Sequence, residues 1–188
     1  MISHRSIARV AWLRRGLKGD GRSAYLAPMT LQSVRDFFAA KAPDIDIIVT
    51  SESSATVALA AEAHGVEPAQ IAKTICARAG ARTFVVVMAG TTRLDNRKFK
   101  DLFGTKPRML GGDDVVQVTG HPVGGVCPFG LLSPLPVYCD QSLRRFDVVV
   151  PAAGAINAAV RISPERMAEL TDALWVDVGQ DPESGTSA

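Results

Sequence analysis

The sequence predicts one domain of the mixed α/β class, in which a central mixed β-sheet is flanked by helices. Strand and helix patterns are interspersed along the chain without strict alternation, and no internal repeat is evident. The run Phe84-Val85-Val86-Val87-Met88 is apolar throughout, which is typical of a central strand buried on both faces. A chain of 188 residues with 47% hydrophobic residues is long enough to bury such a core.

Helix and strand signals follow one another through the first half of the domain. Thr30 is suited to be an N-cap, and apolar residues recur after it at helical spacing up to Ala42-Pro43, where a helix must stop. Gly80 lies in a tight turn between two apolar segments, which are therefore predicted to be strands. The predicted elements are a helix over 31–41, a strand over 45–50, a helix from Ser53 or Ser54 through Glu62 to Gly65, a helical turn over 68–71, and strands over 73–78 and 83–89.

The second half continues in the same mixed manner. Asp95 is expected to cap a helix that ends at Gly104. That helix should bury Phe99, Leu102 and Phe103 at helical spacing. The other predicted elements are a short helix over 113–118, strands over 136–139, 147–150 and 158–162, a last helix that opens at Ser163-Pro164-Glu165 and presents Met167, Leu170 and Leu174, and a closing segment over 175–178.

The net charge of +2 hides an uneven distribution of charge. Residues 1–28 carry six basic side chains against Asp20 alone, a net charge of +5, so the other residues sum to −3. The globular part is therefore mildly acidic, which argues against a protein that coats RNA in general. We expect residues 1–28 to be a basic, disordered extension, residues 29–178 to form the domain and residues 179–188 to be a flexible polar tail.

Cysteine and histidine usage argues against a disulfide framework and against a metal site. The three cysteines are widely spaced and odd in number, and with the three histidines they show no metal-ligand spacing. We therefore expect no metal and no other cofactor, and a reducing cytoplasm as the compartment. No apolar run approaches the roughly 18 residues of a membrane span, so no membrane contact is expected.

Several common enzyme motifs are absent from the sequence. No G-x-G-x-x-G opens a helix after a strand and there is no Walker loop, which argues against a Rossmann or P-loop enzyme. There is no G-x-S-x-G nucleophile elbow either. Cys127 and His121 could form a nucleophile pair, although a cysteine between valine and proline is more often an inert wall.

The segment Thr119–Gly130, called the glycine loop below, organises the chain. Its four glycines and two prolines exclude a regular helix or a central strand. Gly124 and Gly125 lack a Cβ atom, so their N–H groups can approach a carbonyl, a developing oxyanion or a phosphate. The alternative is a tight structural crossing with no ligand.

Lys73 lies at the mouth of an apolar strand, between Ala72 and Thr74. A half-buried ammonium there needs an anionic partner, and a substrate phosphate or a carboxylate would serve. The alternative is a lysine that extends from a strand end into water.

A basic run offers a candidate contact for a nucleic-acid backbone. A solvated helix face is the commoner cause of such a run. Its members are Arg93, Arg97, Lys98, Lys100, Lys106 and Arg108, with Asp95 and Asp101 between them.

Short motifs along most of the domain carry a resemblance to a known family. They are Ile71-Ala72-Lys73-Thr74, Leu94-Asp95, Thr119-Gly120, Val123-Gly124-Gly125, Pro128-Phe129-Gly130, Leu135-Pro136 and Asp140. In this order they resemble the YbaK/prolyl-tRNA-synthetase-associated family, over about residues 30–178. Its members are trans-acting aminoacyl-tRNA deacylases, related to the editing insertion of bacterial prolyl-tRNA synthetases. The resemblance implies a YbaK-like domain with a partly barrel-like sheet.

The resemblance also implies roles for individual residues. Lys73 matches the family lysine that is needed for activity and contacts the 3′-terminal nucleotide. Gly124, Gly125 and Pro128 match the loop whose backbone holds the aminoacyl ester, and Asp140 matches a pocket aspartate of some members. The other expected substrate-binding residues are Ser51, His121, Val126, Cys127, Phe129, Gly130 and Asn157.

The chain departs from the family's Cys-tRNA deacylases at two places. Those enzymes have a tyrosine where Ser51 stands here and a serine where Cys127 stands. The resemblance therefore predicts the reaction class and leaves the amino-acid specificity open.

The resemblance leads to the hypothesis of a freestanding editing enzyme that hydrolyses the ester of a mischarged tRNA. The substrate would be of the Cys-tRNA(Pro) type or carry another small amino acid such as Ala, Ser or Thr. Backbone N–H groups of Gly124–Phe129 would stabilise the oxyanion and Lys73 would fix the terminal phosphate. Water, the vicinal ribose hydroxyl or the substrate side chain would attack.

The expected partners are the 3′ acceptor end of an aminoacyl-tRNA and prolyl-tRNA synthetase. Two other functions compete with the enzyme. The protein could be a non-catalytic module that binds tRNA ends or docks on a synthetase, or a small protein that binds a nucleotide or phosphate ligand.

Overall fold

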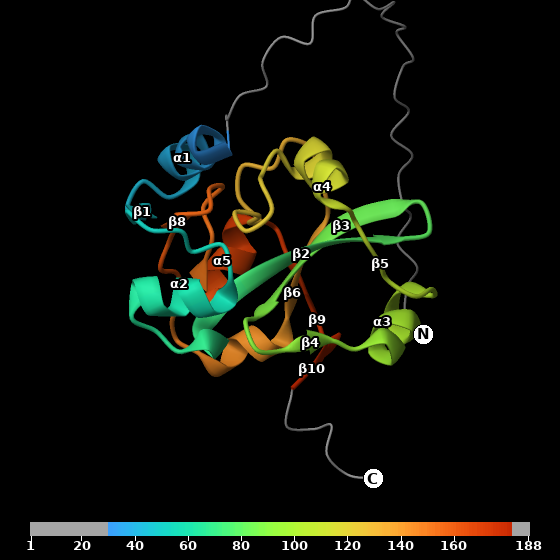
Figure 1. Cartoon of the computed structure of the whole chain (residues 1–188). Helices are drawn as coiled ribbons and strands as arrows, with labels where there is room; N and C mark the ends of the chain where they lie inside the picture. Colours follow the sequence, from blue (N-terminus) through green and yellow to red (C-terminus); the bar gives the residue numbers. More distant parts are fainter. Residues whose placement is uncertain (1–29, 182–188) are drawn as a thin grey trace, which may run out of the picture.

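The computed structural model describes residues 30–181, so the expected extension over 1–28 and most of the expected tail lie outside the described residues. A six-stranded mixed sheet forms the centre of a single mixed α/β domain, which confirms the predicted fold class (Figure 1). Its strand order is β5-β2-β3-β6-β9, and β7 joins β2. The sheet consists of β2 (Ile71–Ala79), β3 (Arg82–Ala89), β5 (Arg108–Met109), β6 (Val137–Asp140), β7 (Val150–Pro151) and β9 (Leu174–Val176).

The hairpin of β2 and β3 is the backbone of this sheet. The two strands pair antiparallel from Ala72↔Ala89 to Ala79↔Arg82, around the predicted turn at Gly80. On the other side, β3 pairs parallel with β6, which pairs parallel with β9. The order leaves β5 and β9 as ends of the path, so the partly barrel-like closure is not found among the described strands.

Apolar layers cover both faces of β3, as its continuous hydrophobic run predicts. Val85 and Val87 belong to the larger core, beneath the helix α1 and the glycine loop. Phe84, Val86 and Met88 belong to a second core on the other face, where α3 packs. All five side chains of the run are 2% exposed or less. The helices are α1 (Thr30–Lys41), α2 (Val57–His64), α3 (Asn96–Phe103), α4 (Gly112–Thr119) and α5 (Pro164–Leu170).

Most helix limits agree with the predicted caps. The helical turn Pro68–Gln70 and the cap residues Asp95, Gly65, Gly104 and Ser163 are found as expected. The cap of α2 was predicted wrongly, because Thr56 accepts the N–H of Leu59 while the Ser54 hydroxyl donates to the carbonyl of Ile156.

Two apolar side chains are not buried as predicted. Leu102 is 53% exposed, because Phe99 and Phe103 are the residues of α3 that pack against Phe84. Leu174 is 64% exposed, since the helix ends at Leu170 and Leu174 begins the edge strand β9.

Short strands account for the remaining differences. The strands β1 (Ile48–Val49) and β8 (Ala158–Ala159) pair with each other and are shorter than predicted. The pair β4 (Arg93–Leu94) and β10 (Gly179–Gln180) was not predicted, and neither was β5. The strand predicted over 147–150 is found only as β7, which begins at Val150. Two residues carry no periodic pattern, so pairs of this length are set by tertiary contacts. The pairing of β10 also orders the start of the expected tail.

Candidate active site

A cavity of about 300 Å³ beside β2 is the best candidate for a functional site. Its walls come from the start of α2, from β2, from the segment after β5, from the glycine loop, and from β7 and β8. Small or branched apolar side chains, among them Val57, Ala72, Val126, Val150 and Ala158, form most of the lining. Polar groups are few, and they are concentrated on β2 and at the start of α2.

Lys73 on β2 lines this cavity and is half-buried. Its Nζ donates hydrogen bonds to the carbonyl of Gly90, at 2.9 Å, and to that of Thr92, and it forms no ion pair within residues 30–181. Burial lowers the pKa of Lys73, and the nearby guanidinium of Arg93 lowers it further. Because an ammonium has three N–H groups, one donor remains for an anionic ligand.

A gap in the hydrogen bonding of β2 borders the cavity. β7 pairs with the first two residues of β2, and β5 pairs with it only near its end. Leu110 N–H donates to the carbonyl of Cys76 at 3.3 Å, so the N–H and C=O of Thr74, two residues earlier, point to the same side. No strand of the described chain pairs there, and Thr74 Oγ1 is buried without a hydrogen-bond partner. Sequence reasoning missed Thr74, a polar residue next to Lys73 in an apolar strand.

Both glycines at the centre of the glycine loop are required by contacts within the protein. Gly124 has a φ of +87°, and a Cβ atom on it would lie 2.8 Å from the Cβ of Ala55. A Cβ atom on Gly125 would lie 2.8 Å from the carbonyl carbon of Ala155. The loop is therefore a tight crossing, yet Gly124 also lines the cavity, whereas Gly125 does not.

The N–H groups of this loop differ in their availability. Gly125 N–H donates to the carbonyl of Pro122 at 2.9 Å, so it is not free for a ligand. The N–H groups of Gly124 and Val126 have no hydrogen-bond partner within residues 30–181, and both residues line the cavity. The expected row of donors from Gly124 to Phe129 is thus reduced to two at this cavity.

His121, Cys127 and Phe129 lie in the hydrophobic core and are fully buried. His121 Nε2 is 2.9 Å from the carbonyl oxygen of Phe129 and 3.6 Å from Cys127 Sγ. Burial raises the pKa of the Cys127 thiol to about 12, and burial lowers the pKa of His121. A neutral thiol outside the cavity is a poor nucleophile, so the geometry supports the interpretation that Cys127 is an unreactive core residue.

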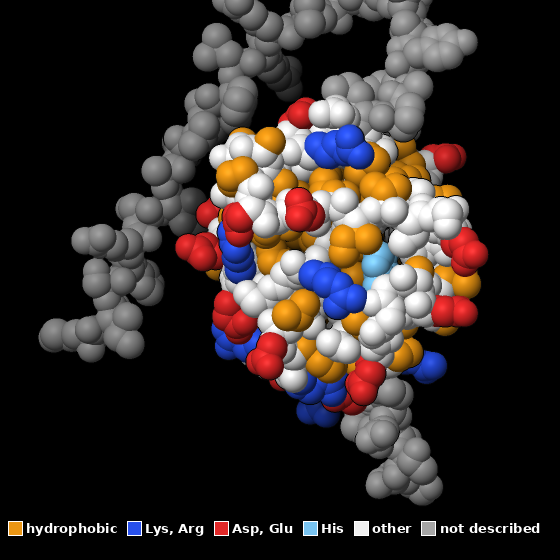
Figure 2. All heavy atoms as spheres, turned by 90° about the vertical axis from the view of Figure 1, so that its left-hand side faces the viewer, with side chains coloured by type: hydrophobic (Ala, Val, Ile, Leu, Met, Phe, Trp, Pro, Cys, Tyr) orange, Lys and Arg blue, Asp and Glu red, His pale blue; other side chains and the backbone are white. Residues whose placement is uncertain are grey.

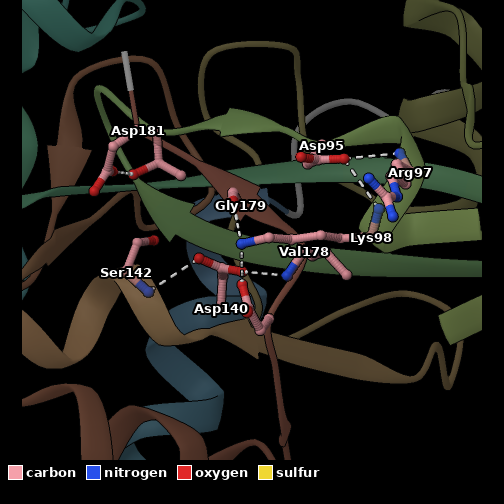
Figure 3. A network of polar contacts seen from close by, with 10 residues as sticks. Asp95, Arg97, Lys98, Asp140, Ser142, Val178, Gly179 and Asp181 are labelled. Carbon is pink, nitrogen blue, oxygen red and sulfur yellow. Dashed lines mark hydrogen bonds and ion pairs between the residues drawn. The ribbon is translucent and has the colours of Figure 1, made fainter. Parts of the chain in front are cut away.

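Other residues predicted for the site also lie outside the cavity: Ser51, Pro128, Gly130, Asp140 and Asn157. Asn157 Nδ2 donates to the carbonyl of Thr50 at 2.8 Å and so joins β8 to the end of β1. A Cβ atom on Gly130 would lie 2.6 Å from the carbonyl oxygen of Ser33, because the loop packs against α1. Asp140 is buried in a different polar network, around the carboxyl end of β6 (Figure 3).

The amino end of α2 also faces the cavity. Ala55, Thr56 and Val57 line it, and Thr56 is the N-cap. The first N–H groups of a helix lack partners within the helix and carry the positive end of its dipole. Together with the Lys73 ammonium, they give the cavity lining positive charge, which attracts an anion.

The basic run is spread over a largely solvated part of the surface. Lys98 pairs with Asp177 at 2.7 Å, and α3 packs through Phe99 on the sheet face turned away from α1. Arg93 is the member that acts on Lys73. Figure 2 shows the other side of the molecule, over α1 and α2, where acidic and basic side chains are interspersed among apolar ones.

Within residues 30–181, no group of three or more His, Cys, Asp or Glu side chains is arranged to hold a metal ion. In the same range, no helix is long and apolar enough to cross a membrane. The fold and the cavity define a small α/β domain with an apolar cleft that is lined by cationic and amide donors. The chain belongs to the family of aminoacyl-tRNA editing domains, whose model matches residues 51–170, and this confirms the resemblance seen in the sequence.

Individual relatives agree with this assignment. The uncharacterized protein YwhH of Bacillus subtilis is 42% identical over 155 residues, which cover 81% of this chain and 99% of that protein. A proline--tRNA ligase of Solidesulfovibrio magneticus is 32% identical over 115 residues, which cover 60% of this chain and 17% of the ligase. A crystal structure described as a candidate trans-editing enzyme for prolyl-tRNA synthetase has a TM-score of 0.75 at 29% identity and covers 83% of this chain and 99% of that one.

Proposed function

We propose that this protein is an aminoacyl-tRNA deacylase that acts in trans and hydrolyses the ester between a mischarged amino acid and tRNA. One observation carries the proposal. Lys73 and the unpaired N–H groups of Gly124 and Val126 line the same cavity of about 300 Å³. Membership of the editing family supports the reaction class. A cytoplasmic location, where tRNAs are charged, follows from the proposal.

The positively charged groups around the cavity bind the 3′-terminal nucleotide in this mechanism. The free N–H of Lys73, the Arg93 guanidinium and the amino end of α2 attract its phosphate. Fixing the phosphate holds the ester near the loop, which converts an encounter into a positioned reaction.

The amide donors act on the ester itself. Gly124 N–H and Val126 N–H stabilise the negative charge that develops on the carbonyl oxygen, and one such donor is typically worth about 3 kcal/mol. The C=O of Thr74 accepts from the α-ammonium group of the amino acid. Water attacks the carbonyl carbon, the bond to the ribose oxygen breaks, and that oxygen takes up the proton of the water, which gives the free amino acid and tRNA. The vicinal ribose hydroxyl would assist by accepting and passing on this proton, and attack by the substrate side chain would instead give a cyclic product that water opens afterwards.

The volume of the cavity favours a small amino acid. About 300 Å³ must hold the terminal nucleoside as well as the amino acid, so alanyl or cysteinyl groups fit better than large ones, with seryl and threonyl groups as further candidates. Discrimination by one methylene is limited to about 1–3 kcal/mol, so more than one small amino acid should be accepted. The similarity to part of a proline--tRNA ligase supports tRNA(Pro) as the tRNA and the synthetase as a partner.

A deacylation panel tests the proposal. The purified protein is incubated with tRNA(Pro) charged with Ala, Cys, Ser, Thr or Pro, and the remaining ester is measured over time. Loss of at least one non-cognate amino acid, faster than without protein, is the expected result. Binding of tRNA without any turnover would support the non-catalytic module instead.

A further inference from the structure

Asp140, at the carboxyl end of β6, is a buried carboxylate that the proposed mechanism does not use. It is 1% exposed and forms no ion pair in the described part of the chain. Its Oδ1 accepts from Ser142 N–H at 3.0 Å and its Oδ2 from Val178 N–H at 2.8 Å (Figure 3). A buried carboxylate without an ion pair is stabilised by the hydrogen bonds that it accepts. The two N–H donors therefore identify the segments that Asp140 holds in place.

The hydrogen bond between Asp140 and Ser142 connects Asp140 to the carbonyl of Gly90, one of the two carbonyls that accept from Lys73. Ser142 is fixed by Asp140, and its hydroxyl oxygen accepts from Ala89 N–H at 3.1 Å. The next residue after Ala89 is Gly90, whose carbonyl accepts from Lys73 Nζ at 2.9 Å. Asp140 thus anchors the end of β3 from which this carbonyl projects.

The hydrogen bond between Asp140 and Val178 connects Asp140 to the carbonyl of Thr92, the other acceptor of Lys73. The hydrogen bond from Val178 N–H to Asp140 holds the next residue, Gly179, against Asp140 and Thr92. A Cβ atom added to Gly179 would lie 2.6 Å from Asp140 Oδ1 and also 2.6 Å from Thr92 Cγ2. Thr92 is 1% exposed, and its carbonyl accepts the second hydrogen bond of Lys73. The pairing of Gly179 with Leu94 holds β10 against the chain that follows Thr92.

We propose that Asp140 is a positioning residue, which fixes the carbonyls of Gly90 and Thr92 and through them the ammonium of Lys73 in the cavity wall. The contribution to catalysis rests on the proposed function, whereas the positioning does not. Asp140 reaches the site through two independent branches, so its loss should release Lys73 without removing any group from the cavity.

The direct test measures how fast the ammonium protons of Lys73 exchange with water, by ¹⁵N NMR. The Lys73 signal is assigned by its absence in Lys73→Ala. In Asp140→Asn, the side-chain NH₂ faces a backbone N–H, one bond is lost, and we expect exchange to be about tenfold faster. Ser142→Ala, which cuts only the first branch, should give a smaller increase. Asp44→Asn is the matched control, because Asp44 is an exposed partner of Arg166 that belongs to neither branch, and should change nothing.

Unchanged exchange in both Asp140→Asn and Ser142→Ala would overturn the proposal. If Asp140→Asn does not fold by circular dichroism, Ser142→Ala decides alone. The measurement needs no tRNA, so a protein that deacylates nothing would refute the proposed function and leave this result standing.

A binding experiment separates positioning from general damage. The probe is adenosine 5′-phosphate that carries alanine through a 3′-amide, which cannot be hydrolysed. Asp140→Asn should weaken its binding about tenfold in the parent chain and not at all in Lys73→Ala, because the effect passes through Lys73. Equal weakening in both backgrounds would contradict the proposal.

Discussion

Lys73 on β2 and Gly124 in the glycine loop line the same cavity, although they come from segments far apart in the sequence. The approach of Gly124 to Ala55 holds the loop against the start of α2. The carbonyls of Gly90 and Thr92 hold the Lys73 ammonium at another wall. A cation and free amide donors therefore meet around a small apolar space, and each part of this arrangement can be tested separately.

Replacement of Lys73 should reduce deacylation strongly. Lys73→Ala removes the ammonium that binds the phosphate, and a charge-assisted hydrogen bond of about 1.5–3 kcal/mol corresponds to a loss of about 10- to 100-fold in kcat/KM. Lys73→Arg keeps the charge but does not fit the two-carbonyl site, so it should recover only part of the rate. Single-turnover kinetics measure both variants, and a Lys73→Ala enzyme as fast as the parent would exclude this role.

Binding of the non-hydrolysable adenosine probe should weaken at alkaline pH. Burial lowers the pKa of Lys73, so the ammonium loses its proton, and its phosphate contact, below the ordinary lysine pKa of about 10.4. A probe with a 5′-phosphate should therefore lose affinity as pH rises through this lowered pKa. A calorimetric titration of Lys73→Ala should lack the transition, and a parent affinity that stays constant up to about pH 10.4 would refute the assignment.

The same pKa shift affects folding with the opposite sign. The unfolded chain binds more protons than the native protein between the lowered pKa and the ordinary one, so the Lys73 contribution to stability rises with pH across that window. The difference in unfolding free energy between the parent and Lys73→Ala, measured with urea at several pH values, should follow this rise. A difference that is independent of pH would contradict it.

Gly124→Ala should lower both stability and activity. The new Cβ atom would lie 2.8 Å from Ala55 Cβ at a φ of +87°, and such strain typically costs about 1–3 kcal/mol. Gly80→Ala is the matched control, since Gly80 also has a positive φ, of 61°, but has nothing within 4 Å of the added atom. Gly80→Ala should lose some stability and keep full activity. Equal deacylation rates for both variants would show that the loop does not shape the site.

Cys127→Ala should remain an active deacylase. The thiol is fully buried with a pKa raised to about 12, so it cannot supply a thiolate at neutral pH. The native protein should resist iodoacetamide at Cys127 by mass spectrometry and react after unfolding. An inactive but folded Cys127→Ala enzyme would restore the nucleophile hypothesis.

The parts of the fold that were predicted correctly are those with a local pattern. The apolar run of β3, the caps at Asp95 and Ser163 and the glycine stops of α2 and α3 are written in neighbouring residues. The pairs β1–β8 and β4–β10 depend on residues more than 80 positions apart, and two-residue strands leave no periodicity to detect.

The candidate site follows the same division. Lys73 could be recognised from the sequence because it is a charged residue in an apolar strand. The glycine pair could be recognised because such a glycine- and proline-rich segment does not form a regular helix or a central strand. The burial of His121 and Cys127, the occupied N–H of Gly125 and the place of Asp140 depend on tertiary packing. The unpaired edge at Thr74 arises from where β5 and β7 stop, which no local pattern records.

The central claim is tested most directly by deacylation of mischarged tRNA(Pro) by the parent protein, Lys73→Ala and Gly124→Ala under identical conditions. The account predicts that the parent removes at least one small non-cognate amino acid and that both variants are slower by about tenfold or more. A parent protein that removes none of them, or variants that match an active parent, would contradict it.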